Sequence, residues 1–450
     1  MPGEMDVSTL CSDIIRTTAR LLDTVTPSPH CLVVGFSGGV DSGLLLHALS
    51  YYSSLPVHGV YIHHGLSPNA DTWQNHCETF CHHRNVIFSA LSVNVTVQSR
   101  TSLEASARDA RYDALLSYCR QHNGALVLGQ HQDDQLETLL LAIKRGSGPA
   151  GLAGMPELHY RQVSESESPV AILRPLLNFR REDIKAAADS LGMPRVEDES
   201  NQDDRFDRNF LRNRVLPDMH RRWPGFAKAA LRSCELLQEQ NALLAEVTAE
   251  RLKDAETGNG GLSVPALLLQ STGWQRAMIR HWLTGLGVTL PSKAQMDEIL
   301  AVLHARDDAT PCVKAGAGVI RRYNSELLVT ADSRSCTEVM MQESVDPQPV
   351  DIEQWQQVPG LPVTFKISGP GDWQRVPAVS LDKIYVSRNP TGKTARKWFK
   401  QWKVPPWERE RIPVLLCNGE AAALLLTDRV VWLAAGNQDL NRIMYKSSGE

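Results

Sequence analysis

Apolar and polar positions follow two different periods over the first 200 residues. Short runs rich in Val, Ile and Leu are separated by longer stretches in which apolar residues recur three and four positions apart. Strands that alternate with helices in this way form a parallel sheet covered on both faces. We therefore expect a doubly wound α/β domain with its ligand at the carboxyl ends of the strands. The predicted strands are 31–36, 57–62, 86–88 and 125–129, and the predicted helices are 43–50, 71–84, 102–122 and 133–145.

The pattern becomes helical after Pro217. Leucines recur at helical spacing in the following 30 residues, and the run 274–286 is amphipathic. A stretch rich in Ser, Asp, Gln and Pro then predicts a linker, and β-like runs follow around a basic helix at 394–402. The expected divisions are an α/β domain over 1–216, a mainly helical domain over 217–330, a linker over 331–350 and a small mixed α/β domain over 351–450.

The composition is that of a globular protein. Hydrophobic residues make up 42% and charged residues 22% of the 450, which excludes a disordered or fibrous chain. The N-terminus has no basic leader and the chain has no run of 18 apolar residues, so we expect a cytoplasmic protein. Nine scattered cysteines without a CxxC pair argue against disulfides and structural zinc. Cys77 and Cys81, with histidines beside them, suggest a metal, but the second ligand pair is missing.

Positive charge is concentrated in two segments, although the formal net charge of the chain is −4. Residues 205–232, the first basic block, contain eight Lys or Arg against two Asp. Residues 388–411, the second basic block, contain eight Lys or Arg against two Glu, so each block carries +6 and the rest of the chain −16. A charged run is often only a solvated surface. Two basic blocks on an acidic protein nevertheless suggest a polyanionic partner such as nucleic acid.

The string SGGVDS at 37–42 lies between a predicted strand and a predicted helix. Glycines allow a tight turn and a close approach to a ligand, and the N–H groups at the start of a helix attract anions. Ser37 and Ser42 add hydroxyl donors, and Asp41 can lie near a Mg²⁺ ion that neutralises phosphates. An ordinary capped turn has a similar composition. The complete string in this position predicts a phosphate-binding loop.

Three acidic residues open the helix predicted after the strand 125–129. Asp134 and Glu137 are three positions apart and Asp133 and Glu137 four apart, so they share one side of the helix. Such a cluster repels itself unless a cation binds, which suits Mg²⁺ or an ammonium group. Helix starts also favour acidic residues for capping alone. Next to the loop at 37–42, we interpret the cluster as catalytic.

SGGVDS is not a Walker A pattern, because no GK[ST] closes it. It resembles the signature of the PP-loop, or N-type, ATP pyrophosphatases, which cleave ATP between its α and β phosphates. Further strings resemble, in the same order, the lysidine synthetases that modify isoleucine tRNA. These strings are HHGL at 63–66, EASARDARY at 104–112, GQHQDDQLET at 129–138, RGSG at 145–148, GLAGM at 151–155, RPLL at 174–177, EDESN at 197–201, RNFLR at 208–212, GPGD at 369–372 and VPPWER at 404–409.

This resemblance implies that ATP, with Mg²⁺, adenylates the wobble cytidine of a tRNA(Ile) with a CAU anticodon. The ε-amine of L-lysine then displaces AMP, and the lysidine formed changes decoding and charging from AUG and Met to AUA and Ile. The implied residues are Ser37, Gly38, Gly39, Val40, Asp41, Ser42 and Arg111 for ATP, Asp41 and Asp134 for the metal, and Asp41, Asp134 and Glu137 for catalysis. The two basic blocks supply Arg205, Arg208, Arg212, Arg396, Lys397 and Lys400 for tRNA.

Two other functions stay open at this level. A PP-loop tRNA thiolase would use an iron–sulfur cluster or a catalytic cysteine pair, and the lack of CxxC near the loop argues against it. An inactive RNA-binding protein would not need SGGVDS and DDQLET. The string at 369–372 departs from the family because Gly369 stands where a basic residue is expected. The sequence does not decide between a monomer and a homodimer.

Overall fold

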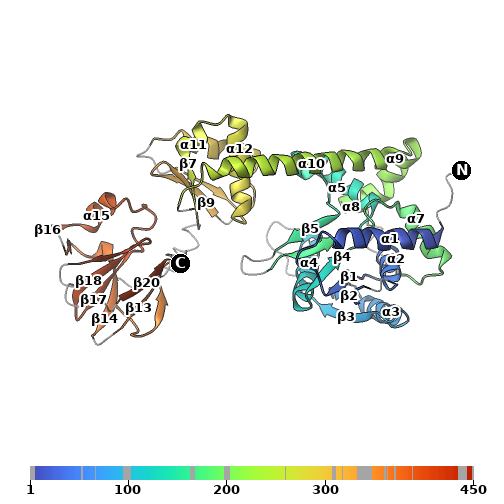
Figure 1. The fold of residues 1–450 in the computed structure, drawn as a ribbon, viewed down its shortest axis with the longest axis horizontal. Coiled ribbons are helices and arrows are strands. Elements are labelled where there is room, and N and C mark those ends of the chain that lie inside the picture. Colours follow the sequence, from blue (N-terminus) through green and yellow to red (C-terminus); the bar gives the residue numbers. More distant parts are fainter. Residues whose placement is uncertain are drawn as a thin grey trace. The chain divides into compact units, whose positions relative to one another are not determined.

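The computed structural model divides the chain into two compact units, Met1–Glu246 and Val247–Glu450, and each is described by itself (Figure 1). None of the helices in the described ranges is both long and apolar enough to cross a membrane. The segment 197–201 and most of the expected linker lie outside these ranges. The described residues are 6–51, 54–65, 67–94, 103–162, 168–196, 203–258, 260–306, 311–316, 318–331, 347–358, 361, 363–368, 371–387, 389–433 and 443–447.

A six-stranded sheet forms the centre of the first unit. Its order is β3-β2-β1-β4-β6-β5, and all neighbours are parallel except β5, which runs antiparallel to β6. The predicted doubly wound parallel sheet is thus confirmed, and β5 and β6 extend it beyond the four predicted strands. The strands are β1 (Cys31–Gly35), β2 (Val57–His63), β3 (Ile87–Ser92), β4 (Gly124–Val127), β5 (Leu158–Arg161) and β6 (Val170–Leu173).

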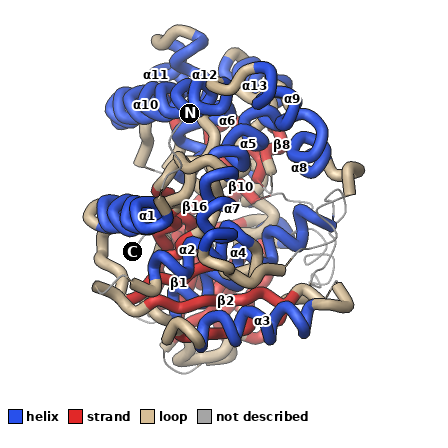
Figure 2. The backbone as a smooth tube through the Cα atoms, turned by 90° about the vertical axis from the view of Figure 1, so that its right-hand side faces the viewer, coloured by secondary structure: helices blue, strands red, loops and turns tan. Residues whose placement is uncertain are grey.

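Alternate residues of β1 face two separate hydrophobic cores. Leu32 and Val34 belong to a core that also contains residues of α1, α2, α3 and α7, whereas Cys31 and Val33 belong to one with residues of α4. Burial on both faces explains why β1 is apolar throughout. The same helices can be followed around the strands in Figure 2. They are α1 (Val7–Leu22), α2 (Val40–Leu49), α3 (Ala70–His82), α4 (Leu103–Gln121) and α7 (Arg181–Ser190).

A second group of helices continues the first unit. Leu136 of α5 packs with Leu216, Ala227 and Ala230 in a small core of its own. The amide of Gln238 in α10 donates to the carbonyl of Ala153 at 2.7 Å, which ties this group to the loop after α6. The elements are α5 (Gln132–Lys144), α6 (Pro149–Leu152), α8 (Asp207–Phe210), the π-helical turn η2 (Leu211–Val215), α9 (Leu216–Arg222) and α10 (Phe226–Lys253).

The second unit begins with the end of α10 and contains helices around one buried core. An antiparallel sheet of order β7-β10-β9-β8 packs with them, which the helical spacing of this region did not predict. Its strands are short, and β7 has only two residues, so they carry little periodic signal. The elements are α11 (Val264–Leu268), α12 (Thr272–Gly285), α13 (Lys293–Leu303), β7 (Leu262–Ser263), β8 (Cys312–Ala315), β9 (Gly318–Tyr323) and β10 (Glu326–Ala331).

Beyond residue 346 the described residues form antiparallel sheets of five, three and two strands around another core. The predicted basic helix is present as α15 (Ala395–Gln401), and it buries Trp398 and Phe399 in that core. The expected domain boundaries at 216, 330 and 350 stay predictions. The remaining elements are β11 (Gln348–Pro349), β12 (Trp355–Gln357), β13 (Val363–Ile367), β14 (Trp373–Pro377), η3 (Ala378–Ser380), β15 (Ile384–Val386), β16 (Asn389–Lys393), β17 (Pro413–Cys417), β18 (Glu420–Leu425), β19 (Val430–Trp432) and β20 (Ile443–Ser447).

Replacement of Trp398 by Ala tests whether this residue is core or an RNA-stacking surface. Trp398 is 2% exposed, stacks on Trp402 and donates from its indole to the carbonyl of Ile384 at 2.9 Å. We expect Trp398→Ala to lower the free energy of unfolding by roughly 3–5 kcal/mol, measured by urea denaturation. Trp355→Ala is the control, because Trp355 is 45% exposed. Unchanged stability with weakened RNA binding would assign Trp398 to stacking instead.

Candidate active site

The phosphate loop connects β1 to α2. Gly38 has a φ of +80°, which favours glycine. The N–H of Ser37 donates to Oγ of Ser42 at 3.3 Å, and that hydroxyl donates to the carbonyl of Gly39 at 3.3 Å, so the loop is closed on itself. Gly39 precedes α2 and provides no side-chain cap. The first N–H groups of the helix therefore point to a position where an anion can bind.

Gly129 brings the end of β4 against this loop. A β-carbon at Gly129 would lie 3.1 Å from the carbonyl carbon of Asp41 and 3.1 Å from the nitrogen of Ser42. Both are backbone atoms and cannot move aside as a flexible side chain does. Only glycine permits this approach, and it brings His131, two residues later, close to Asp41.

His131 links the loop to α5. Its Nδ1 accepts the N–H of Asp133 at 3.2 Å, which caps the helix and leaves the ring proton on Nε2. Nε2 lies 3.7 Å from Asp41 and 3.4 Å from Asp134. Burial by itself lowers the pKa of His131, which is 1% exposed, but the carboxylates of Asp134 and Asp41 outweigh burial and raise it. The ring proton on Nε2 thus faces two carboxylates, which favour the binding of a second proton, although Nδ1 would then lose its bond to the start of the helix.

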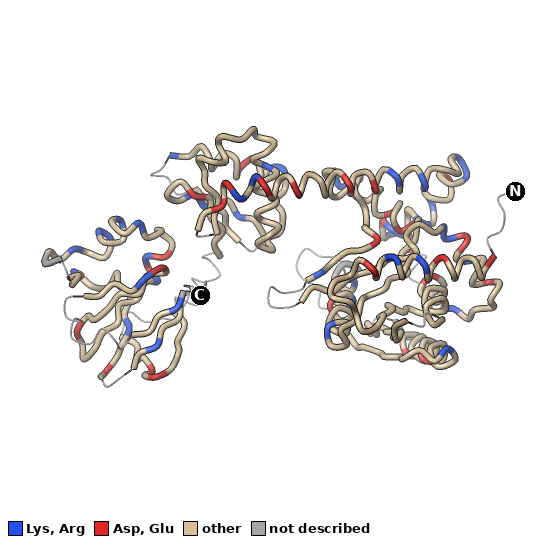
Figure 3. The backbone as a smooth tube through the Cα atoms, in the orientation of Figure 1, with Lys and Arg blue, Asp and Glu red and all other residues tan. Residues whose placement is uncertain are grey.

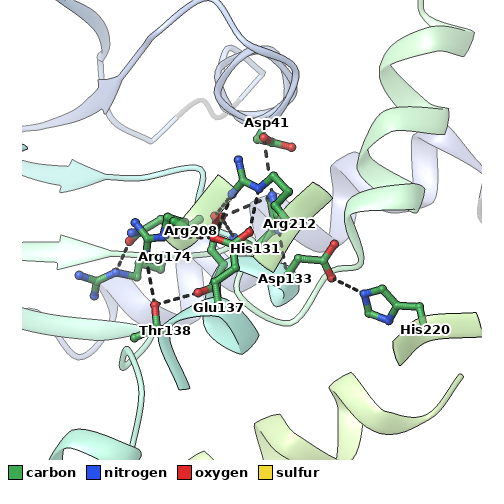
Figure 4. Close-up of polar contacts among 11 residues, drawn as sticks. Asp41, His131, Asp133, Glu137, Thr138, Arg174, Arg208, Arg212 and His220 are labelled. Carbon is green, nitrogen blue, oxygen red and sulfur yellow. Dashed lines mark hydrogen bonds and ion pairs between the residues drawn. The ribbon is translucent and has the colours of Figure 1, made fainter. Parts of the chain in front are cut away.

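Glu137 lies at the centre of a buried ion-pair group (Figure 4). Its side chain has no exposed surface, and Arg212 donates to both carboxylate oxygens, at 2.7 and 3.1 Å. Arg212 also donates to Asp134 at 2.8 Å, and Nε of Arg208 lies 3.2 Å from Glu137. Burial raises the pKa of Glu137, and the guanidinium of Arg212 offsets part of that effect. The bidentate geometry is that of an ionised carboxylate.

Two residues near this group were missed by the sequence analysis. Nε2 of His220 in α9 lies 3.3 Å from Asp133. Arg181, the first residue of α7, lies close enough for its charge to act on Asp41. Burial by itself raises the pKa of Asp41, but His131, Arg181 and Arg212 outweigh burial and lower it. The paired arginines at 180 and 181 were the available signal, yet they look like any exposed start of a helix.

The structure brings some of the predicted site residues together and places others elsewhere. The loop 37–42, Asp134 and Glu137 share one site with Arg208 and Arg212, which were predicted to contact tRNA and here pair with carboxylates. Arg205 is 88% exposed and pairs with Asp203, and Arg111 is exposed on α4. The predicted tRNA contacts of the second unit, Arg396, Lys397 and Lys400, are exposed on α15. Figure 3 shows where Lys and Arg lie along the backbone of this unit. Roles in binding ATP or tRNA stay predictions for all of them.

Asp41 has one carboxylate oxygen that suits a cation. Its Oδ1 is buried without a hydrogen-bond partner among the described residues, and burial of such an oxygen is costly unless a ligand pairs it. The described ranges contain no group of three or more His, Cys, Asp or Glu that could hold a metal by itself. Mg²⁺ commonly uses one or two carboxylates together with substrate phosphates and water. Asp41 beside the phosphate loop fits that kind of site.

The cysteines nearest to the loop are unsuited to thiol chemistry. Cys77 and Cys81 of α3 have no exposed surface. Burial raises the pKa of each thiol to about 12, so both are protonated at neutral pH. A thiol must ionise to act as a nucleophile. Their position under the loop is explained by packing, since the sulfur of Cys77 would contact a β-carbon at Gly38.

Comparison with known proteins gives matches along most of the chain. Family models match residues 11–219 (PP-loop domain), 262–328 (TilS substrate binding domain) and 380–432 (TilS substrate C-terminal domain). A tRNA(Ile)-lysidine synthase of Vibrio parahaemolyticus is 36% identical over 425 residues, which cover 90% of this chain and 93% of that protein. One of Shigella flexneri is 39% identical over 437 residues, covering 92% and 96%. Among solved structures, the U34-tRNA thiolase NcsA of Methanococcus maripaludis matches with a TM-score of 0.42 at 15% identity, covering 51% of this chain and 80% of that one.

The charge on His131 makes stability depend on pH. Its pKa is raised in the folded state from 6.5, so its contribution is fully present below pH 6.5 and is lost as the pH rises through the folded value. We expect the difference in melting temperature between the wild type and His131→Asn to be largest below pH 6.5 and to shrink above it. Melting curves between pH 5.5 and 9 measure this. A difference that does not change with pH would contradict the raised pKa of His131.

Proposed function

The chain belongs to the tRNA(Ile)-lysidine synthase family, and from this premise we propose that it joins L-lysine to carbon 2 of the wobble cytidine in the CAU anticodon of tRNA(Ile). ATP is the proposed co-substrate, and AMP and pyrophosphate the products, which makes the enzyme a ligase. One observation supports this most directly: a phosphate loop and a carboxylate group lie next to each other, connected by His131 within 3.7 Å of Asp41 and 3.4 Å of Asp134. A triphosphate and an amine can therefore meet at one place. Because the substrate is a tRNA, we expect the enzyme to act in the cytoplasm.

The first proposed step is adenylation of the RNA. The phosphates of ATP bind at 37–42, where the N–H groups at the start of α2 and the hydroxyls of Ser37 and Ser42 can donate to them. Asp41 would hold a Mg²⁺ ion, which would neutralise charge on the phosphates. O2 of the cytidine attacks the α-phosphate, the bond between the α and β phosphates breaks, and pyrophosphate leaves.

The second proposed step transfers lysine. The ε-amine attacks carbon 2, a C–N bond forms, the C2–O bond to the adenylate breaks, and AMP leaves. Asp134 is 16% exposed and Glu137 fully buried, so Asp134 is better placed to orient the amine and accept its proton. Glu137, held by two arginines, fixes the position of Arg212 and through it of Asp134. Both carboxylates thus take part, one by contact and one by positioning.

The two basic blocks are proposed to bind tRNA phosphates. In the first block, Arg205, Arg221 and Arg222 are exposed, whereas Arg208 and Arg212 pair with Glu137. In the second block, Arg396, Lys397 and Lys400 share the exposed side of α15. Arg205 and Arg221 pair with Asp203 and Asp218 at the surface, where solvent weakens such pairs, so these cations can exchange them for RNA phosphates at little cost.

Mass spectrometry of the RNA tests the proposed function. Purified enzyme is incubated with unmodified tRNA(Ile), ATP and isotopically labelled lysine, and the anticodon nucleosides are analysed. We expect labelled lysidine in place of the wobble cytidine and one AMP released for each. Unmodified cytidine, or a sulfur-containing product, would refute the proposal.

The variants Asp41→Ala and Asp134→Ala should lower AMP release by roughly 10²-fold or more, because each removes a carboxylate that the substrate complex requires. Asp134→Ala also removes a partner of Arg212 and of the His131 N–H, so its melting temperature is measured and its rate is compared where it is folded. Asp13→Ala is the matched control, since Asp13 is a partly exposed residue of α1 that pairs with Arg16 on the same helix. Rates of AMP release with saturating tRNA and lysine measure the effect. Near wild-type turnover of either variant shows that its carboxylate is not needed.

Salt dependence separates the roles of the two basic blocks from that of the ATP site. Each phosphate contact contributes roughly 0.7–0.9 to the slope of log affinity against log salt. Two triple variants should flatten this slope in filter-binding titrations with tRNA. One replaces Arg205, Arg221 and Arg222 by Ala, and the other replaces Arg396, Lys397 and Lys400 by Ala. ATP affinity should stay within twofold, as judged by calorimetry. Slopes equal to that of the wild type in both variants mean that the blocks are only solvated surface.

A further inference from the structure

Three arginines surround the ring of Tyr112 in the first unit. Arg108, on the same helix, has its Cζ 5.8 Å from the ring centroid, and Arg161, at the end of β5, has its Cζ at 5.2 Å. Arg174 directly follows β6 and lies close enough to Tyr112 for the two side chains to interact. We call these four residues the Tyr112 cluster. Neither basic block contains any of them.

Arg174 is buried with neutral partners. It is 6% exposed. Its Nε donates to the amide oxygen of Gln130 at 2.5 Å and its Nη1 to the carbonyl of Pro156 at 2.9 Å. Burial lowers the pKa of Arg174, and Tyr112 offsets part of the effect. A buried cation needs an anion nearby, because neutral acceptors replace only part of its lost hydration.

The described side chains supply little negative charge to the cluster. Asp113 is 54% exposed and lies 4.0 Å from Arg161, the outer limit of an ion pair. Burial, followed by the charges of Arg174 and Arg161, lowers the pKa of the neighbouring His159, which is consistent with a positive potential here. Three guanidinium groups with one distant carboxylate leave the cluster suited to an anion.

One end of the cluster, Arg174, lies beside the candidate active site, whereas Arg161 pairs with Val170 at the start of the antiparallel neighbour β6 and so lies toward the opposite edge of the sheet. Arg174 follows the carboxyl end of β6 as Gln130 and His131 follow that of β4, and ligands of doubly wound sheets bind at this edge. In Figure 4, Arg174 lies on the side of the carboxylate group away from His220. Arg161 is 37% exposed, so a ligand can reach it from solvent. Arg174 is buried and adds positive charge from the interior of the protein.

We propose that the Tyr112 cluster binds a phosphodiester group of the RNA backbone. This rests on the proposed function, which makes RNA the substrate. The phosphates of ATP already have the loop at 37–42 and the start of α2. Guanidinium forks match the paired oxygens of a phosphodiester, and an aromatic ring beside them suits single-stranded RNA. Arg161 makes the contact, and Arg174 and Arg108 strengthen the field around it.

The test uses the full chain and an anticodon stem-loop RNA of tRNA(Ile), bound in anisotropy titrations over a salt series. Arg161→Ala removes the contact, Arg161→Lys keeps the charge, and Arg16→Ala is the control, because Arg16 is an 80% exposed arginine of α1 in an i,i+3 pair. We expect Arg161→Ala to weaken RNA binding roughly tenfold and lower the salt slope by about 0.7–0.9. Arg161→Lys should retain most of the slope, and ATP binding should be unchanged in all three variants.

A scan of the phosphates in the anticodon loop of the RNA identifies the phosphate that Arg161 contacts. Methylphosphonates, which carry no charge, replace one phosphate at a time. At one position, the wild type should lose about tenfold in affinity and Arg161→Ala should lose nothing further. If the affinity losses caused by Arg161→Ala and by the methylphosphonate add up at every position, the proposal is overturned. A loss of ATP binding in Arg161→Ala with RNA binding intact also overturns it. If the wild type binds the RNA but forms no lysidine, the proposed function fails while the phosphate contact is still decided by the scan.

Discussion

The pairing of Glu137 with Arg212 and Arg208 joins α5 to α8 and η2. A carboxylate without exposed surface is stable only beside cations that replace its hydration, and loss of one partner of such a pair typically costs about 3–5 kcal/mol. The carboxylate belongs to α5 and the arginines to α8 and η2, more than 70 positions later in the chain. Their ion pairs therefore hold the start of the first basic block against the carboxylates of α5.

A second constraint acts through the backbone. Gly129 allows the end of β4 to touch the first residues of α2, and His131 then reaches Asp41 from the position where it caps α5. One histidine thus contacts the carboxylate of the phosphate loop and that of the acidic cluster. A change in the charge at either carboxylate alters the pKa of His131, so Asp41 and Asp134 are electrostatically coupled through this ring.

The sequence predicted the sheet and the phosphate loop well because both depend on local pattern. Continuous apolar strands, glycines at a turn and acids at a helix start are visible in single segments. Contacts between residues that are distant in the chain are not visible in any single segment. Arg208 and Arg212 were grouped with surface charges because their spacing shows the charge but not the carboxylate it meets. The sheet β7-β10-β9-β8 was missed because its strands are short and its order depends on contacts between distant segments.

Most charges of the site are neutralised within the protein, and the two exceptions in the described residues have opposite signs. Asp41 has a buried carboxylate oxygen without a donor, and Arg174 is a buried guanidinium whose side-chain hydrogen bonds are to neutral acceptors. A fully neutralised site would gain nothing by binding a charged ligand, whereas each exception gains when its counter-charge arrives. In the proposed function, a cation bound with the nucleotide would satisfy the first and an RNA phosphate the second. Both ligands would then gain binding energy where the protein leaves a buried charge incompletely paired.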